Sequence, residues 1–142
     1  MTAITTANMI AALRGFARPR LWLGIWLFGW ALCIVLSLVS PLQVGVSIDN
    51  SDKIGHFLAY ATLSAWAVMI FERRRDWAWA ALALVLLGIT MELAQGALTD
   101  NRLMDPLDAV ANGLGVLAGL CVGLTPVRVL LLRVERRWLL RA

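Results

Sequence analysis

The sequence predicts an all-α integral membrane protein: a four-helix bundle with both termini cytoplasmic and a short amphipathic interfacial helix at the C-terminus. Three observations predict it. The 142 residues are 61% hydrophobic, with a mean hydropathy of +0.77. Charged residues make up 15% of the chain, against roughly 25% in a soluble domain. The apolar residues gather in four runs, each close to the about 20 residues that a helix needs to cross a bilayer.

The chain length fits one membrane domain, residues 1–142. The first predicted span covers residues 21–40 and follows an arginine-containing arm. Its apolar run is too long for a cleaved signal peptide and lacks a small-residue cleavage pattern, so we expect a retained anchor. The second, third and fourth predicted spans cover residues 54–71, 77–98 and 107–127, joined by short segments.

Small and aromatic residues recur at helical spacing in the first and fourth spans. Trp22, Trp26 and Trp30 are four residues apart, and we expect them to contact lipid, with Trp22 at the headgroup level. The fourth span carries a ridge of small residues, which permits close helix approach and predicts a central position for this span. The ridge also leaves open a homo-oligomer formed through Gly115, Gly119 and Gly123.

The basic residues predict the orientation. All but two of the 13 lysines and arginines lie in the N-terminal arm, in the loop between spans two and three, or in the tail, residues 128–142. The exceptions are Lys53 and Arg102. Because cytoplasmic loops are rich in Lys and Arg, both termini are expected in the cytoplasm. The net charge of +4 is then a topology signal and gives no reason to expect nucleic-acid binding. The tail mixes arginines with leucines and tryptophan, which predicts a helix lying on the membrane surface.

Polar side chains inside spans two to four are the main functional signal, because a polar group in hydrocarbon is costly and usually faces a protein interior or a cavity. They are His56 and Tyr60, then Glu92 and Gln95, then Asp108 and Asn112. Spacings of three and four place each group on one helix face. Since neighbouring helices run in opposite directions, all three groups fall near the outer ends. The pattern predicts a polar pocket open to the outside, with Asp52, Lys53, Arg102 and Asp105 at its mouth, in helical register with the polar groups of spans two and four.

Each of these residues also has a structural interpretation. Asp105 before Pro106 is typical of a helix N-cap, Asp108 then sits in the first turn, and Asp52 is a second candidate cap. Hydrogen bonds between helices would explain Tyr60, Gln95 and Asn112. The acid–base candidates are His56, Glu92 and Asp108; the ligand-binding candidates are Asp52, Lys53, Tyr60, Gln95, Arg102, Asp105 and Asn112.

A metal ligand set of His56, Glu92, Asp105 and Asp108 is chemically possible. The spacing matches no metal motif, so the sequence predicts no metal site and leaves any cofactor unknown.

The order and spacing of the polar residues resemble the VanZ-like family. The resemblance covers about residues 20–125 and is carried by Asp52-Lys53, His56-Phe57, Tyr60, Glu92, Gln95, Arg102, Asp105, Asp108 and Asn112, with Gly113 and Gly115. It implies a small multi-pass protein of the bacterial cytoplasmic (inner) membrane with a role in the cell envelope. The family's namesake is associated with resistance to teicoplanin, a glycopeptide antibiotic with a lipid tail.

Three functions follow as hypotheses. The first is a protein that binds or handles an amphiphilic, anionic or glycosylated molecule, such as a membrane lipid or a lipid-linked glycan; the resemblance adds a lipoglycopeptide and glycopeptide resistance. The second is a membrane-embedded hydrolase or transferase that uses His56, Glu92 and Asp108. The third is a structural subunit of a membrane complex.

Overall fold

The computed structural model describes residues 6–38, 51–98 and 105–139. Within these ranges all of the regular elements are helices. Three of them are long and apolar enough to cross a membrane: Pro19–Leu38, Arg74–Ala97 and Pro106–Leu124. The described part of the chain therefore confirms the prediction of a helical protein, with three helices that could span a membrane.

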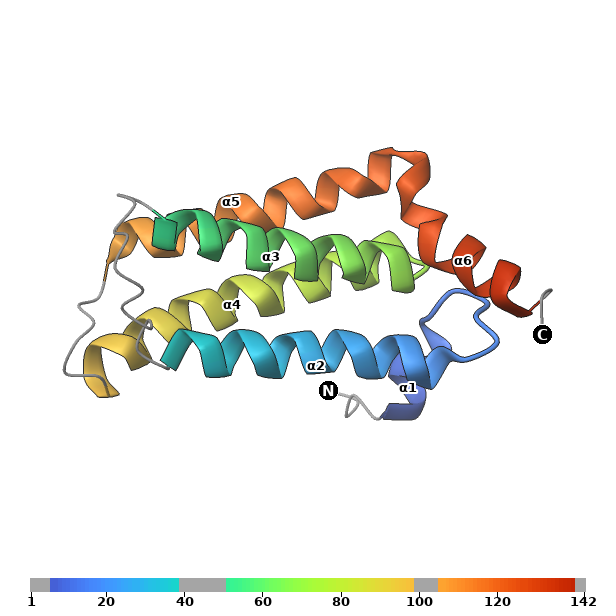
Figure 1. Ribbon diagram of the computed structural model, residues 1–142, viewed down its shortest axis with the longest axis horizontal. Helices are drawn as coiled ribbons and strands as arrows, with labels where there is room; N and C mark the ends of the chain where they lie inside the picture. Colours follow the sequence, from blue (N-terminus) through green and yellow to red (C-terminus); the bar gives the residue numbers. More distant parts are fainter. Residues whose placement is uncertain (1–5, 39–50, 99–104, 140–142) are drawn as a thin grey trace.

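Four long helices lie side by side, and two short ones sit together at one end (Figure 1). In chain order the helices are α1 (Thr6–Ala11), α2 (Pro19–Leu38), α3 (Ser51–Ile70), α4 (Arg74–Leu98), α5 (Pro106–Cys121) and α6 (Leu130–Leu139), with 3-10 turns at Val122–Leu124 and Pro126–Val129. Helices α2 to α5 match the four predicted spans to within a few residues, except at the end of the fourth. Helix α5 ends at Cys121, whereas the predicted span ends at residue 127. The sequence did not predict α1.

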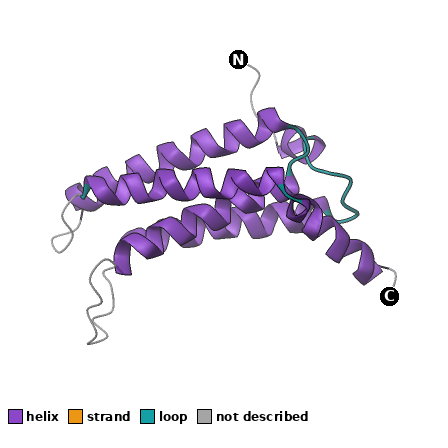
Figure 2. Cartoon of the chain, turned by 90° about the horizontal axis from the view of Figure 1, so that it is seen from above, coloured by secondary structure: helices purple, strands orange, loops and turns teal. Residues whose placement is uncertain are grey.

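Helix α3 occupies the central position, since it contacts α2, α4, α5 and α6. Among the long helices that the structure describes, α3 alone is not apolar enough to be a candidate membrane span. Its polar residues Lys53, His56, Tyr60 and Ser64 lower its hydropathy. The expectation that the fourth span is central was therefore wrong. Helix α3 has the most neighbouring helices instead, and its polar residues His56, Tyr60 and Ser64 are buried. Figure 2 shows the packed long helices from a second direction.

The glycine ridge of α5 packs against α3. A Cβ at Gly115 would collide with the carbonyl oxygen of Phe57, and one at Gly119 would lie 2.5 Å from that of Ala61. Gly123 lies against the ring of Trp77. The close approach is confirmed within the chain, and association of two copies through these glycines stays a prediction.

The tryptophans of α2 mostly face the protein. Trp22 and Trp26 are 4% and 5% exposed. The Trp22 indole nitrogen donates to Glu135 Oε1 at 2.8 Å, and that of Trp26 donates to the Leu63 carbonyl at 2.9 Å. Because lipid tails cannot accept these hydrogen bonds, the indole N–H groups favour the protein interior. The expected lipid contact is wrong for these two residues.

The N-terminal arm caps the end of α3 that lies near α6. The last carbonyls of a helix have no partner within it. Here the Arg14 guanidinium donates to the carbonyls of Met69 and Val68, both at 3.2 Å, and the Arg14 backbone N–H donates to Ile70 at 2.9 Å. Arg14 is thus a helix-capping residue as well as one of the basic residues that predicted the orientation.

Helix α6 is tied to the start of α2 by one carboxylate. Glu135 is 3% exposed. Besides the Trp22 indole, it accepts the backbone N–H groups of Ala17 at 2.7 Å and Arg18 at 3.0 Å. A negative charge at a helix N-terminus also interacts favourably with the helix dipole. The tail is therefore docked on its own chain through Glu135, while Arg133, Arg136 and Arg137 are exposed.

We expect Gly119→Ala to reduce the free energy of unfolding by about 1–3 kcal/mol, because the added methyl meets α3 backbone that cannot yield without moving the helix. Gly113→Ala is the matched control, since a Cβ there meets nothing within 4 Å. Thermal unfolding in detergent measures both. Equal melting temperatures for the two variants would contradict the close α3–α5 contact.

Glu135→Ala is expected to release α6, because three N–H donors lose a charged acceptor worth about 1.5–3 kcal/mol for each hydrogen bond. Limited trypsin digestion measures the release through faster cleavage after Arg133, Arg136 and Arg137. The exposed Glu72→Gln is the control at the same end of the molecule. An unchanged cleavage rate in Glu135→Ala would show that the tail is held in another way.

Candidate functional site

The polar side chains inside α3, α4 and α5 face the protein interior. Six of them are between 1% and 9% exposed: His56, Tyr60, Glu92, Gln95, Asp108 and Asn112. They come from the beginning of α3, the end of α4 and the beginning of α5, which is the end of the long helices away from α6 (Figure 1). The structure therefore confirms that the three polar stripes share one end of the molecule and point inward.

The stripes can meet because a small residue lies between them. A Cβ at Gly88 of α4 would lie 3.1 Å from the Asn112 side chain and 3.4 Å from the Tyr60 ring. At this level α3, α4 and α5 are thus in direct contact. Any larger residue at position 88 would push the polar side chains of α3 and α5 away from α4.

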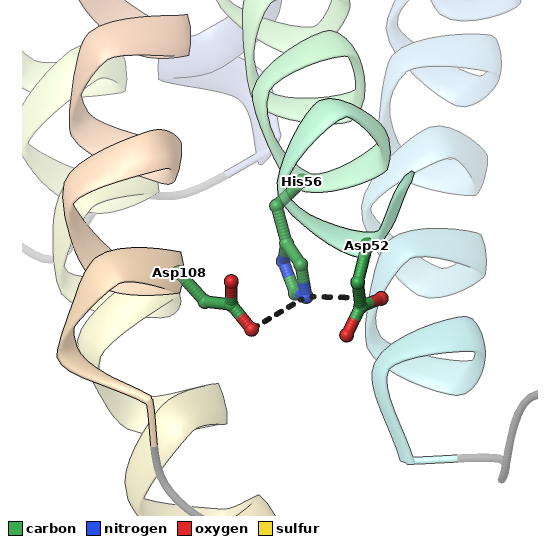
Figure 3. A group of neighbouring side chains, drawn as sticks. All are labelled: Asp52, His56 and Asp108. Atoms are coloured by element: carbon green, nitrogen blue, oxygen red, sulfur yellow. Dashed lines mark ion pairs between the residues drawn. The ribbon is translucent and has the colours of Figure 1, made fainter. Parts of the chain in front are cut away.

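His56 stands at the centre of the site. Its Nδ1 lies 3.2 Å from Asn112 Oδ1. Its Nε2 lies 3.7 Å from Asp108 Oδ2 and 3.9 Å from Asp52 Oδ1 (Figure 3). Asp52 and His56 are one turn apart on α3, as Asp108 and Asn112 are on α5, so the spacing that aligned them in sequence also places them opposite each other.

Lys53 is already paired with carboxylates of α5. Its Nζ lies 2.7 Å from Asp105 Oδ2 and 3.6 Å from Asp108 Oδ1. The hydrogen bond from Lys53, followed by that from the Leu107 N–H, lowers the pKa of the Asp105 carboxyl below its ordinary value. Asp105 therefore stays charged at neutral pH. The positive charge of Lys53 is paired with the carboxylates of Asp105 and Asp108. The other cation expected at the mouth, Arg102, lies outside the described residues.

The beginning of α5 has the expected cap. Asp105 is the N-cap in an extended conformation, with φ −113° and ψ 106°, and its Oδ1 accepts the Leu107 N–H at 2.9 Å. Pro106 follows at the first helical position, where it costs no backbone hydrogen bond. Helix α3 begins at Ser51, so Asp52 lies within its first turn instead of at the N-cap. Its carboxylate is consequently directed toward His56.

Glu92 and Gln95 connect α4 to the other helices. Glu92 Oε1 accepts the backbone N–H of Asp105, and Gln95 Nε2 donates to the Ser37 carbonyl of α2 at 2.7 Å. From the sequence, we expect His56, Lys53 or Arg102 to stabilise the Glu92 carboxylate. Its partner is a backbone group at the start of α5, because the Glu92 face of α4 is turned toward that turn of chain. Glu92 thus helps to position Asp105, and the titratable side chains that the structure brings together are His56, Asp52 and Asp108.

A cleft of about 300 Å³ opens beside His56, between α2 and α3. Asp52, His56 and Ser37 supply its polar wall, and the rest of its lining is small or apolar: Cys33, Leu36, Gly55 and Ala59. The sequence argument assigned no site residue to α2. Ser37 was the only signal available there, and a single serine in an apolar span does not indicate which helix it faces.

Comparison with known proteins adds no relative to this picture. No protein-family model matches the chain, and neither the curated proteins nor the solved structures give a significant match. The function therefore has to be argued from the geometry of this site.

Replacing Lys53 by Met is expected to lower the melting temperature by several degrees, because it leaves the buried Asp108 carboxylate without its ammonium partner. Lys53→Arg keeps the charge and is expected to recover most of the loss. Arg74→Met, which removes an exposed charge at the opposite end of the molecule, is the control. A Lys53→Met protein that unfolds at the wild-type temperature would show that the pairing contributes nothing.

Proposed function

We propose that all four long helices cross the bacterial cytoplasmic membrane, with both termini in the cytoplasm, as a four-helix bundle of the VanZ-like type. The equal length of α2 and α3, 20 residues each, supports a crossing by α3 despite its polar residues. Exposed arginines at the α1 and α6 end support the orientation. In this arrangement the His56 site faces the outer leaflet and α6 lies at the cytoplasmic surface. Family membership is supported by the order and spacing of the polar residues.

The function that the site supports best is binding or handling of an amphiphilic molecule in cell-envelope metabolism. The observation that carries it is the cleft beside His56, which has a polar wall next to an apolar one at a single end of the helices. Its volume is at the small end of the about 300–1,000 Å³ typical of ligand pockets. A polar head fits such a cleft while the apolar tail remains among the exposed apolar residues of α2 and α3.

The charges of the site favour a glycosylated head over a simple anion. The cleft is lined by the carboxylate of Asp52 and by His56, and the nearby ammonium of Lys53 is held by Asp105 and Asp108. A bare phosphate would meet an acidic wall, and Lys53, the cation that the described residues place at this site, is already paired. Sugar hydroxyls can donate to the carboxylates, so a glycolipid or lipid-linked glycan is the better match. Glycopeptide resistance stays a prediction from the resemblance.

A membrane-embedded hydrolase or transferase is the second candidate. It is favoured by the contact of His56 with two carboxylates across the cleft wall, since an imidazole oriented by acidic neighbours is suited to proton transfer. The substrate would be the same class of lipid, so both candidate functions require the cleft to bind that lipid.

Native mass spectrometry of the chain released from nanodiscs tests the proposal. The nanodiscs would contain bacterial polar lipids with either a polyprenyl-phosphate sugar or polyprenyl phosphate. We expect the wild type to retain the sugar-bearing lipid preferentially. Ala59→Trp should fill the cleft and abolish the adduct at an unchanged melting temperature.

Ala118→Trp is the matched control, because Ala118 is exposed on α5 and lines no part of the cleft. Retention of the adduct by Ala59→Trp would place the lipid elsewhere. No preference for the sugar-bearing lipid in the wild type would remove the binding proposal and favour a structural subunit.

A further inference from the structure

We propose that Asp52, His56 and Asp108 bind one divalent transition-metal ion, of the class of Zn²⁺. One ligand atom from each residue lies within 4.8 Å of the other two. The set combines an imidazole nitrogen with two carboxylate oxygens, a donor combination that suits Zn²⁺. It differs from the set considered from the sequence, since Asp52 takes the place of Glu92 and Asp105.

Asn112 orients the imidazole for this role. A carbonyl oxygen can only accept a hydrogen bond, so the contact of Nδ1 with Asn112 Oδ1 at 3.2 Å places the proton on Nδ1. The lone pair of a neutral His56 is then on Nε2, the atom that faces the two carboxylates (Figure 3). Metal-binding histidines typically use their second nitrogen in this way, which fixes the tautomer and the ring plane.

Nε2 lacks a hydrogen bond to any residue that the structure describes. His56 is 9% exposed, and the contacts of Nε2 with Asp108 and Asp52, at 3.7 and 3.9 Å, are too long for hydrogen bonds. They do match the separation of two ligands around one ion. With metal–ligand bonds of about 2.1 Å, ligand atoms are separated by about 3.4 Å in a tetrahedron, and small side-chain movements close the difference.

Asp52 and His56 both line the cleft, so an ion held by them is accessible from it. Three protein ligands leave one position of a tetrahedral ion open, as in catalytic zinc sites. A sugar hydroxyl of the bound head can complete the coordination there. This last step rests on the proposed function, whereas binding of the ion itself does not.

Zinc titration of the full chain in nanodiscs, after treatment with a chelator and dialysis, tests the site. Competition with a chromophoric chelator measures affinity and stoichiometry with Zn²⁺ alone as the probe. We expect one Zn²⁺ per chain, and at least tenfold weaker binding in Asp52→Asn. Asp52 is the most exposed of the three ligands, so this variant keeps its fold, which an unchanged melting temperature confirms. Glu72→Gln, with its exposed carboxyl at the other end, is the control and should bind as the wild type does.

Stoichiometric binding that is lost in Asp52→Asn and in His56→Gln supports the site. Absence of stoichiometric binding in the wild type, or wild-type affinity in both variants, overturns it. The lipid adduct is measured on the same samples. An adduct that persists without zinc binding overturns the ion site alone, and zinc binding without an adduct overturns the proposed function alone.

Discussion

The structure depends on one constraint: a polar group inside an apolar protein in a membrane must find its partner within the protein. Helix α3 carries many such groups, and it contacts all of the other long helices as well as α6. The same constraint acts at the opposite end. There the carbonyls that end α3 are satisfied by Arg14, and the N–H groups that begin α2 are satisfied by Glu135.

The two ends of the helices solve this constraint differently. At the α6 end, Glu135 accepts three N–H groups, and the Arg14 guanidinium donates to two carbonyls. At the His56 end, carboxylates outnumber cations in the described residues, and the Nε2 atom of His56 faces two of them at distances beyond a hydrogen bond. Hydrogen bonds between charged side chains and backbone groups give the α6 end a structural role, whereas an imidazole nitrogen without a hydrogen bond, facing two carboxylates, marks the His56 end as the candidate binding site.

Much of this arrangement could be predicted from the sequence because it depends on periodicity. Spacings of three and four place His56 with Asp52, and Asp108 with Asn112, whatever the surroundings are. The cap at Asp105 and the close approach at Gly119 likewise depend on local chemistry. The rotation of one helix against another is a property of the packed structure, so spacing did not reveal that Glu92 binds the Asp105 backbone. Nor did it reveal the burial of Trp22, whose partner Glu135 is 113 positions away in the chain.

The central claim is that His56 is held between Asn112 and two carboxylates, with its Nε2 lone pair free to bind. His56 is the only histidine of the chain, so NMR of protein labelled with ¹⁵N-histidine observes it without assignment. After removal of metal, the account predicts the tautomer protonated on Nδ1, together with slow exchange of that proton with solvent. The tautomer protonated on Nε2, or a freely exchanging imidazole with the mixture found in water, would contradict it.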